Sequence, residues 1–499
     1  MTSIEKLQKL KTDLIELAVR GKLVEQRQEE VTARELYEKI QQERQKLIAE
    51  GKLKKEKQLP EISEDEIPFE IPKSWKWTRC SNVFNFHLGK TPPRNESKNW
   101  GGSINWVSIS DISASKNGII KETKEYITRD AFEDTFNNVI SPKNTLVMSF
   151  KLSIGKVAFL GINAVHNEAI ISIFPIIKDS SEEIFKKYLF HILPLISKIT
   201  ESTSAIKGKT LNKEKISKML LPLPPLEEQK RIVESLEAKF KVIDKAIALL
   251  ERKADLDKKI KEKILQLAIQ GKLVEQRQEE GTAHELYEKI QQERQILISE
   301  GKLKKEKSLP EISEDEIPFE IPKSWKFLKI GDICEINKRN KLNDNLEVSF
   351  IPMEHVTGGI CNKFKSEIKH WGCVKKNYTH FRDGQIIIAK ITPCFQNRKS
   401  VILRGLKNGF AAGSSEFHTL LPINNNIVDK YILYLIKSEY FINNGCYAFN
   451  GTAGQQRVSA EFINNFIIPL PPYDEQKRIV AKIEQLFNII DSQMVTQDK

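Results

Sequence analysis

The chain has 499 residues, with 79 Lys and Arg against 67 Asp and Glu and a formal net charge of +12. A composition that is 40% hydrophobic and 29% charged can bury cores, so the chain is not a disordered polymer. The longest apolar runs, such as 169–177, are far shorter than the ~20 residues of a membrane span, and the start lacks the pattern of a signal peptide. The six cysteines form no CxxC pair, so we expect a reducing, cytoplasmic location.

An internal repeat organises the chain. Residues 21–76 and 271–326 differ at only five paired positions, so 51 of their 56 residues match. The motif PLPPLEEQKRIV at 222–233 likewise returns as PLPPYDEQKRIV at 469–480. The segments between these copies show no such identity. Each half of the chain is therefore a shared frame around an insert of its own.

Helices with apolar stripes are expected at both ends of the chain and at its centre. The central helix spans 227–270, which is roughly 65 Å at 1.5 Å per residue. Leu236, Phe240 and Ile243 begin a coiled-coil spacing that falters and then resumes at Ile260. The stripe of the N-terminal helix comprises Ile4, Leu7, a position shared by Leu10 and Lys11, Leu14 and Leu17.

The repeat relates 473–499 to 226–250, and 1–20 to 251–270. Both terminal stripes can be buried if the termini come together along the central helix, antiparallel to it. This predicts two globular α+β domains joined by a long antiparallel helical coiled coil. The arrangement would be pseudo-two-fold and circular, with the N- and C-terminal helices packed together. A helix buried in an all-α core is the alternative, which the Lys and Glu on its other faces disfavour.

Each frame copy is expected to begin with a helix, at about 31–50 in the first copy, and to end in a strap. Pro60, Pro68 and Pro72 keep the strap extended, and Trp75 is expected to anchor the entry into the insert. The expected divisions are an N-terminal helix (1–20), a first frame copy (21–76), a first insert (77–221), the central helix (222–270), a second frame copy (271–326), a second insert (327–468) and a C-terminal helix (469–499).

The positive charge lies in the inserts. Residues 77–220 hold 20 Lys and Arg against 13 Asp and Glu, and 327–467 hold 18 against 11, so each insert carries +7 and the rest of the chain −2. The basic residues stand among Asn, Gln, Ser, Thr and aromatic residues, the side chains that bind phosphates and read base edges. A solvated loop surface is the alternative for any one cluster. Two inserts of equal surplus favour nucleic acid.

Both inserts are expected to be compact α+β domains. Short β-rich runs alternate in them with short helices. The β-rich runs are at 170–175, 347–352 and 385–391, and the helices are at 181–199 and 427–441.

The sequence shows no nucleotide or cofactor loop. GKT occurs at 89–91 and 208–210, but a phosphate-binding loop needs Gly where Phe84 and Thr203 stand. No GxGxxG follows a predicted strand, no HExxH occurs, and the Asp/Asn-Pro-Pro-aromatic tetrad of an amino-methyltransferase is missing. We expect no cofactor on this chain.

Metal binding and acid–base catalysis also lack support. Cys361, His370, Cys373 and His380 are irregularly spaced and have no counterpart in the first insert, so we expect no zinc site. The triplet HNE at 166–168 follows a strand and is expected to form a local hydrogen-bonding cluster rather than a general base. We therefore expect a non-catalytic chain.

Three stretches resemble the specificity (S) subunit of type I restriction–modification enzymes, and the resemblance covers essentially the whole chain. They are LGKTPPRNESKNWGGSINWVSISDI at 88–112, STSAIKGKTLNKEKISKMLLPLPPLEEQKRI at 202–232 and GTAGQQRVSAEFINNFIIPLPPYDEQKRI at 451–479. The first resembles the opening of a target-recognition domain, and the other two resemble its close. The PLPPxxEQ join, found twice, is the most specific mark. The second insert departs from the opening pattern because it has no Trp-Gly-Gly.

The resemblance implies that each insert is a target-recognition domain that reads one half of an asymmetric, bipartite site in double-stranded DNA. The helices would set the spacer between the two half-sites. Two modification subunits, resembling adenine-N6 methyltransferases, would dock on the shared frame and bring S-adenosylmethionine. Two restriction subunits with translocase and nuclease activity, where they join, would bring ATP. No membrane partner is expected.

Candidate DNA-binding residues are chosen because Lys and Arg hold phosphates or guanine, whereas Asn, Gln, Ser and Thr read base edges. Gln455 and Gln456 are the preferred adenine contacts, and Trp106 is expected to be an anchor rather than a stacking group. The candidates in the first insert are Lys90, Thr91, Arg94, Lys98, Asn105, Trp106, Ser108, Ser204, Lys207, Lys209 and Asn212. Those in the second insert are Lys338, Arg339, Lys341, His355, Lys390, Arg398, Lys399, Gln455, Gln456 and Arg457.

Two other functions stay open at this point. A standalone DNA-modifying enzyme would need a cofactor loop or a catalytic tetrad, and it would bind S-adenosylmethionine by itself. A coiled-coil scaffold whose inserts bind protein would lack the steep salt dependence of phosphate binding.

Overall fold

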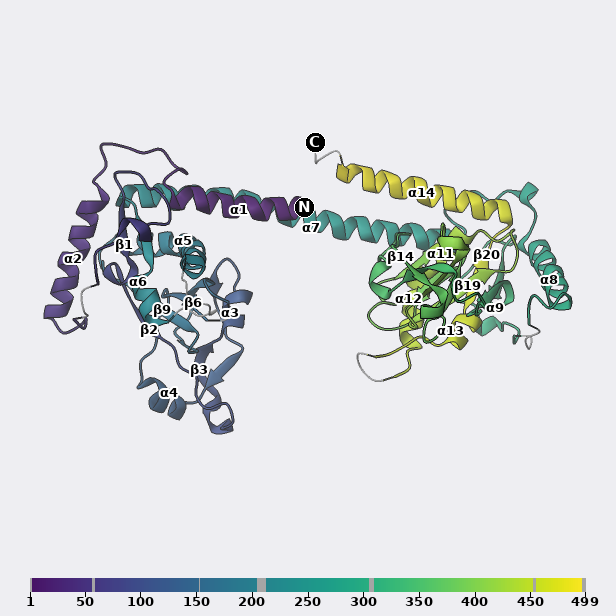
Figure 1. The fold of residues 1–499 in the computed structure, drawn as a ribbon, viewed down its shortest axis with the longest axis horizontal. Helices are drawn as coiled ribbons and strands as arrows, with labels where there is room; N and C mark the ends of the chain where they lie inside the picture. Colours follow the sequence, from purple (N-terminus) through teal and green to yellow (C-terminus); the bar gives the residue numbers. More distant parts are fainter. Residues whose placement is uncertain are drawn as a thin grey trace. The chain divides into compact units, whose positions relative to one another are not determined.

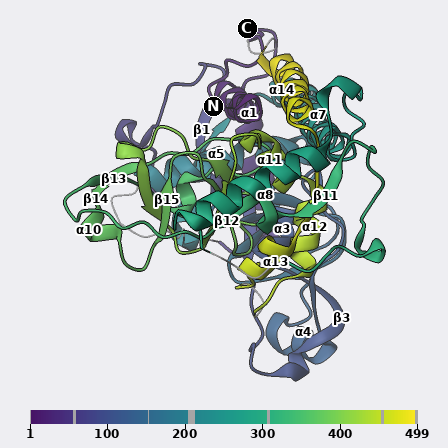
Figure 2. The ribbon, with the colours of Figure 1, turned by 90° about the vertical axis from the view of Figure 1, so that its right-hand side faces the viewer.

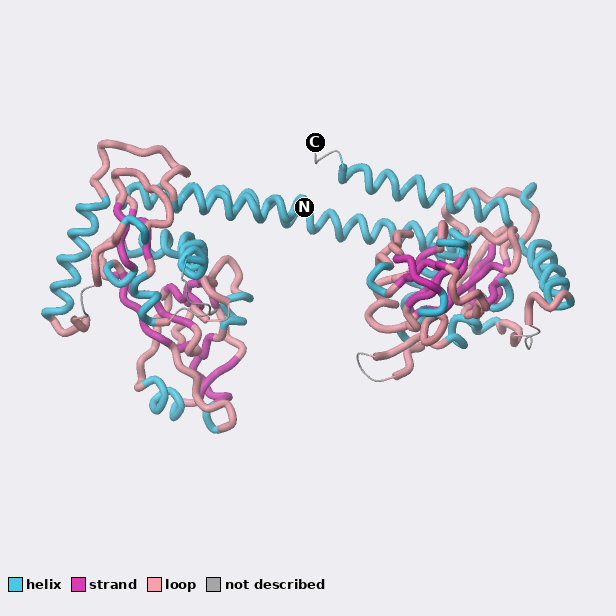
Figure 3. Tube along the Cα trace, viewed as in Figure 1, coloured by secondary structure: helices cyan, strands magenta, loops and turns pink. Residues whose placement is uncertain are grey.

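The computed structural model of the chain describes residues 2–55, 59–151, 153–203, 212–304, 309–451 and 455–495. The chain divides into two compact units, Met1–Leu250 and Glu251–Lys499. Each unit contains one frame copy and one insert. Helix α7 (Leu226–Ile269) is 44 residues long and contributes its first part to one unit and its second part to the other. Figure 3 shows that helices form the frame, while the strands gather mainly in the inserts.

The first unit carries a frame of long helices and an insert of short strands (Figure 1). Strand β3 and helix α4 lie at the end of this insert that is far from α1, in both Figure 1 and Figure 2. Its helices, besides α7, are α1 (Ser3–Val19), α2 (Ala33–Ala49), α3 (Ile109–Ala114), α4 (Arg129–Phe136), α5 (Glu182–Thr203) and α6 (Lys213–Lys218). Its strands are β1 (Lys76–Arg79), β2 (Phe84–Leu88), β3 (Trp100–Val107), β4 (Ile119–Ile120), β5 (Glu125–Ile127), β6 (Leu146–Ser149), β7 (Val157–Leu160), β8 (Val165–His166), β9 (Ile170–Pro175) and β10 (Leu220–Leu223).

The second unit repeats this plan. Its helices, besides α7, are α8 (Ala283–Ser299), α9 (Ile330–Ile333), α10 (Trp371–Val374), α11 (Asp429–Ile436), α12 (Glu439–Tyr447), α13 (Ala460–Asn465) and α14 (Tyr473–Val495). Its strands are β11 (Lys326–Lys329), β12 (Cys334–Ile336), β13 (Glu347–Ile351), β14 (Glu367–His370), β15 (Thr379–Arg382), β16 (Ile386–Ala389), β17 (Ser400–Ile402), β18 (Phe410–Gly413), β19 (Phe417–Pro422) and β20 (Ile467–Leu470).

The two inserts share a strand topology. The first insert has a five-stranded sheet of order β2-β9-β6-β7-β4, and the second has a four-stranded sheet of order β12-β19-β16-β17. Each insert also has a second sheet. In the first insert β3 pairs in parallel with β8 and antiparallel with β5. In the second insert β13 pairs in parallel with β18 and antiparallel with β14. The α+β prediction is therefore confirmed for both inserts, although their sequences show no identity like that of the frame.

A two-stranded sheet joins each insert to its frame. In the first unit β1 pairs with β10, so the strand that enters the insert lies antiparallel to the strand that leaves it. In the second unit β11 pairs with β20 in the same way. The hydrophobic core then continues from the frame into the insert: Trp75 and Leu236 belong to the same buried cluster as Ile171 and Ile192. Frame and insert thus share one buried hydrophobic cluster in each unit.

The terminal helices pack antiparallel to α7, each within its own unit. In the first unit Lys11 pairs with Asp244 at 2.5 Å, while Gln26, further along the chain, bonds to the earlier Glu228. In the second unit Lys261 pairs with Asp491 at 2.6 Å, while Gln276, further along the chain, bonds to the earlier Glu475. Helices α7 and α14 are therefore antiparallel there. The predicted packing of the terminal helices along α7 is confirmed in this form.

The predicted apolar stripes are wrong at Leu17 of α1 and at Ile260 of α7, and of Leu10 and Lys11 it is Lys11 that faces α7. Leu10 is 44% exposed and Leu17 is 40% exposed, whereas Leu14 and Ala18 are buried. Helix α1 is turned so that Lys11 faces α7, where its ammonium lies 5.0 Å from the centre of the Phe240 ring. Likewise Ile260, the predicted resumption of the seam on α7, is 41% exposed, and the buried residues begin again at Ile264.

The helix predicted at 427–441 is two helices, α11 and α12. The break falls at Ser438, whose hydroxyl accepts a hydrogen bond from Phe441 N–H and caps α12. Lys437 just before it is buried, and its ammonium donates to Gly359 O at 2.8 Å and to Arg398 O at 3.0 Å. The capping serine and the buried lysine redirect the chain where the apolar spacing predicted one continuous helix.

Candidate nucleic-acid interface

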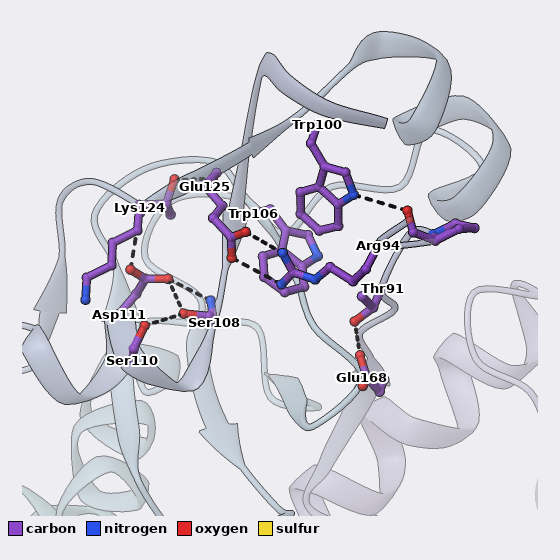
Figure 4. Close-up of polar contacts among 12 residues, drawn as sticks. Thr91, Arg94, Trp100, Trp106, Ser108, Ser110, Asp111, Lys124, Glu125 and Glu168 are labelled. Carbon is purple, nitrogen blue, oxygen red and sulfur yellow. Dashed lines mark hydrogen bonds and ion pairs between the residues drawn. The ribbon is translucent and has the colours of Figure 1, made fainter. Parts of the chain in front are cut away.

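Arg94 lies at the centre of a polar cluster in the first insert (Figure 4). Its guanidinium carbon is 4.0 Å from the ring centre of Trp100 and 4.6 Å from that of Trp106. Its two terminal nitrogens donate to the two carboxylate oxygens of Glu125 on β5, with 3.1 Å between Nη2 and Oε2. The side chain is 51% exposed. The cluster therefore holds a cation at the surface in a defined orientation.

The loop that carries Arg94 leaves β2 through Gly89. A Cβ atom at Gly89 would lie 2.1 Å from Asn167 O and 2.2 Å from His166 O, so the close approach of the two main chains requires glycine. The next N–H, that of Lys90, donates to His166 O at 2.9 Å. The GK sequence that resembles a phosphate loop thus serves to seat this loop on the turn after β8.

A buried hydrogen-bond network supports the turn after β8 from the interior of the insert. His166 Nε2 lies 2.6 Å from the Ser172 hydroxyl, which in turn lies 2.6 Å from the Ser141 hydroxyl. Burial lowers the pKa of His166 to about 4, so the ring is neutral at neutral pH. At the surface of the turn, Glu168 accepts a hydrogen bond from Thr91. The predicted hydrogen-bonding cluster at 166–168 is confirmed.

The candidates on and after β3 are bonded within the insert. Asn105 donates to Asn163 O at 3.0 Å, and the Ser108 hydroxyl donates to Asp111 at 2.7 Å at the start of α3. Trp106 is 1% exposed and donates to Lys90 O at 3.1 Å. Trp106 is among the candidate DNA-binding residues, and this is corrected: its ring is buried and cannot contact DNA. Its role is the expected one of an anchor, because it supports the loop through Lys90 O.

The remaining candidates of the first insert are spread more widely. Lys90 and Lys98 are exposed, the first donating to Thr135 O at 2.7 Å and the second pairing with Glu96 at 3.3 Å. Asn212 lies apart from the Arg94 cluster as the N-cap of α6. Three candidates lie outside the described residues: Ser204, Lys207 and Lys209.

The second insert also presents an arginine held by a glutamate. Arg457 Nε and Nη2 donate to Glu416 at 2.9 and 3.1 Å, and Nη1 donates to Gln455 O at 2.9 Å. Lys390 lies beside this pair, because its N–H donates to Glu416 O and its carbonyl accepts from the residue after Arg457. Gln456 is tied to the same segment through a carbonyl that accepts from residue 392 at 3.0 Å. The structure thus brings four candidates together: Lys390, Gln455, Gln456 and Arg457.

Arg398 has a different place from the one predicted. Its Nη1 pairs with Glu262 of α7 at 2.7 Å, and the side chain is only 10% exposed. A buried guanidinium that is paired in this way attaches the insert to the long helix and offers no surface for DNA, so Arg398 is a second correction. Lys399 beside it donates to Met353 O at 2.9 Å, close to His355 in the same segment.

Lys338 faces the frame. Its ammonium donates to Lys302 O at 3.0 Å and pairs with Glu335 at 2.8 Å. Arg339 and Lys341 are exposed on the segment that follows. These two side chains remain candidates whose contacts with DNA are predictions.

Sequence reasoning missed the two carboxylates that hold candidate cations, Glu125 and Glu416. A count of charges treats each of them as a subtraction from the basic surplus. Each lies far from its partner in the chain, 31 residues for Glu125 and Arg94 and 41 for Glu416 and Arg457. No local spacing signals such a pair, because the pairing depends on which strands are neighbours.

The chain thus contains two α+β inserts of related topology, each joined to its own copy of the frame. Each insert presents an arginine that is paired with a glutamate. This arrangement is that of a protein with two related binding domains. Residues 72–255 and 322–497 match the family described as "Type I restriction modification DNA specificity domain". The chain belongs to this family, and the predicted family is thereby confirmed.

The chain is similar to the EcoEI and EcoAI specificity subunits of type I restriction enzymes from Escherichia coli. The identities are 44% and 45%, each over 235 residues that cover 47% of this chain and 40% of the relative. The match thus spans less than half of those two proteins. A solved structure described as "Structural basis underlying complex assembly and conformational transition of the type I R-M system" has the same fold, with a TM-score of 0.54 at 16% identity, covering 86% of this chain and 94% of that chain.

Membrane-spanning helices and metal-binding clusters are both absent from the part of the chain that the structure describes. No helix there is long and apolar enough to cross a membrane. No group of three or more His, Cys, Asp or Glu side chains there is arranged to hold a metal ion. Cys361 donates its thiol to Gly358 O at 3.2 Å, and His380 bonds to Lys375 O at 3.0 Å, so these two members of the irregular Cys/His set have local protein partners.

Proposed function

We propose that this chain is the DNA-specificity subunit of a type I restriction–modification complex and has no catalytic activity of its own. Each insert would read one half of an asymmetric, bipartite site in double-stranded DNA. Helix α7 would set the gap between the half-sites. S-adenosylmethionine and ATP would be bound by partner subunits, and the expected location is the cytoplasm.

The observation that carries the proposal is a contrast between frame and inserts. The inserts share a topology and an equal surplus of +7 but differ in their exposed side chains. Such a pair of domains is suited to reading two unlike sequences on one polyanion, because phosphate attraction is general whereas base-edge contacts are specific. Membership of the DNA specificity domain family supports the same reading.

The frame would dock two modification subunits, one on each copy. The same hydrogen bonds occur in both units: Trp75 and Gln26 donate to Glu228 in the first, and Trp325 and Gln276 donate to Glu475 in the second. The identity also extends to the exposed face of α2 and α8, where Glu35, Glu38 and Lys39 return 250 residues later. Exposed residues are free to differ in a fold, so their retention supports a shared partner.

Co-expression with the modification subunits of the same system tests the proposal. Genome-wide mapping of methylated adenines should give one asymmetric motif of two half-sites and a fixed gap. Cells that express the modification subunits without this chain are the control and should lack the motif. A continuous or palindromic motif would contradict the proposal that the two inserts recognise two different half-sites.

The rival enzyme is tested separately. The purified full chain should not retain labelled S-adenosylmethionine in equilibrium dialysis, whereas the complex with its modification subunits should. Binding by the chain alone would support a DNA-modifying enzyme instead.

A further inference from the structure

Arg457 keeps part of its hydrogen-bonding capacity for a ligand. A guanidinium has five N–H groups, and three of them are used within the insert: Nε and Nη2 on Glu416, and Nη1 on Gln455 O. Among the described residues no acceptor is recorded for the remaining N–H of Nη1 and of Nη2. The side chain is 41% exposed. Two N–H groups on neighbouring nitrogens are thus available at the surface.

The main chain on both sides of this pair is fixed. Arg457 exchanges two backbone hydrogen bonds with Asn450, at 2.9 and 3.1 Å, and forms a second bridge with Ile391. Glu416 O accepts from Lys390 N–H at 2.9 Å. Because both partners stand on restrained backbone, little conformational freedom remains to be lost when a ligand binds the arginine.

We infer that Arg457 reads a guanine in the half-site of the second insert and that Glu416 orients its guanidinium for this contact. The inference rests on the proposed function, DNA reading by the inserts. Guanine presents O6 and N7 as adjacent acceptors in the major groove, and two N–H groups of one arginine match them.

The glutamate favours a base over a phosphate as the ligand. Glu416 places a carboxylate within 3.1 Å of the guanidinium, so an anion bound to the same group would meet a like charge nearby. A guanine offers its two acceptors without a net charge. The arrangement therefore suits an uncharged acceptor pair better than a backbone phosphate.

Arg94 provides an internal comparison. Both of its terminal nitrogens donate to Glu125, and two indole rings, Trp100 and Trp106, lie within 4.6 Å of its guanidinium. In Arg94 the carboxylate takes the Nη1–Nη2 end of the guanidinium, whereas in Arg457 it takes the Nε–Nη2 side and Gln455 O takes one N–H of Nη1. The two arginines look alike in sequence and differ in what they can still bind.

The test uses the full chain in complex with its modification subunits and a set of duplexes in which each base pair of the mapped site is changed in turn. The wild-type complex should prefer guanine at one position of one half-site by on the order of 10- to 100-fold. Arg457→Lys keeps the charge but not the two-pronged donor, so it should lose most of this preference. Glu416→Gln should weaken it. Selectivity for the other half-site should stay unchanged in both variants and shows that the chain is folded.

Arg404→Lys is the matched control, because Arg404 is an exposed arginine of the same insert paired with a carboxylate, Asp429. It should leave the preference at every position intact. If Arg457→Lys or Arg457→Ala weakens binding equally for all duplexes, or changes nothing, the guanine contact is overturned. If the wild-type complex shows no sequence preference, the proposed function itself fails, and this outcome is seen before any variant is made.

Discussion

Arg94 shows how a surface cation is restrained at the level of single residues. The rings of Trp100 and Trp106 lie within 4.6 Å of its guanidinium, and Glu125 takes the charged end. The charge of this arginine is already paired with Glu125, so a phosphate would compete with that carboxylate for the guanidinium. We therefore expect Glu125 to limit the attraction of this surface for DNA of any sequence.

Glu125→Gln is expected to raise the affinity of the chain for nonspecific DNA. The substitution removes a negative charge and loosens the hold on Arg94, so one more cation is free to pair with a phosphate. The slope of log affinity against log salt should become steeper by about one unit, measured by fluorescence anisotropy of a labelled duplex. Glu122→Gln makes the same change of charge three residues earlier and should have the smaller effect. Equal slopes for the two variants would mean that Glu125 does not restrain Arg94.

At the scale of elements, the join between insert and frame explains the most specific motif of the sequence. The glutamate of PLPPxxEQ is Glu228, which accepts from Trp75 Nε1 at 2.8 Å, and the glutamine is Gln229, which donates to Pro224 O at 2.9 Å. The second copy makes the same bonds through Glu475 and Gln476. The motif therefore holds α7 and α14 to the straps, and the predicted role of Trp75 as an anchor is confirmed.

Trp75→Phe should destabilise the first unit by about 1–3 kcal/mol, because it removes a hydrogen bond from the buried Glu228. Hydrogen exchange should report faster opening of α1 and the first turns of α7. Trp77→Phe is a matched control: no partner is recorded for Trp77 Nε1 among the described residues, and the second copy has Phe327 at this position. Equal losses in the two variants would assign the effect to ring size and not to the hydrogen bond.

The buried glutamate also predicts a dependence on pH. Burial raises the pKa of Glu228 above its ordinary 4.5, against the hydrogen bonds from Trp75 and Gln26 that lower it. The folded state then holds the proton more tightly than the unfolded state does, so the free energy of unfolding falls as pH rises through this window. Glu228→Gln cannot titrate there. Its stability relative to wild type should rise from below pH 4.5 to neutral pH in urea titrations, and a difference independent of pH would contradict the assignment.

For the whole molecule, α7 is the element shared by the two compact units. The frame that flanks it makes the same internal contacts in each unit, while the inserts differ in their surfaces. If α7 sets the gap between half-sites, the length of the helix and the length of the gap must change together. The circular closure of the two terminal helices stays a prediction.

Seven residues of a helix-forming heptad inserted at 250–258 should lengthen the tolerated gap by about three base pairs, since seven residues add roughly 10 Å of helix. Methylation mapping of the variant complex measures the gap directly. The same seven residues placed after Gly51, in the exposed turn that follows α2, should leave it unchanged. An unchanged gap in a folded, active α7 variant would refute the spacing role.

The sequence by itself determined the repeat, the helical frame, the α+β inserts and the location of the basic surplus. These properties are covalent or local, because periodicity, proline positions and charge are read along the chain. The same holds for the family, whose marks are contiguous motifs at 88–112, 202–232 and 451–479.

Only the tertiary structure decided which candidate cations are restrained and which are buried. Trp106 and Arg398 look like interface residues in sequence, yet one supports a loop and the other pairs with Glu262 of α7. Arg457 acquires its orientation from Glu416, a residue 41 positions earlier that meets it across neighbouring segments. Side-chain partners of this kind depend on which strands are neighbours in space. The spacing of residues along the chain does not predict which strands become neighbours.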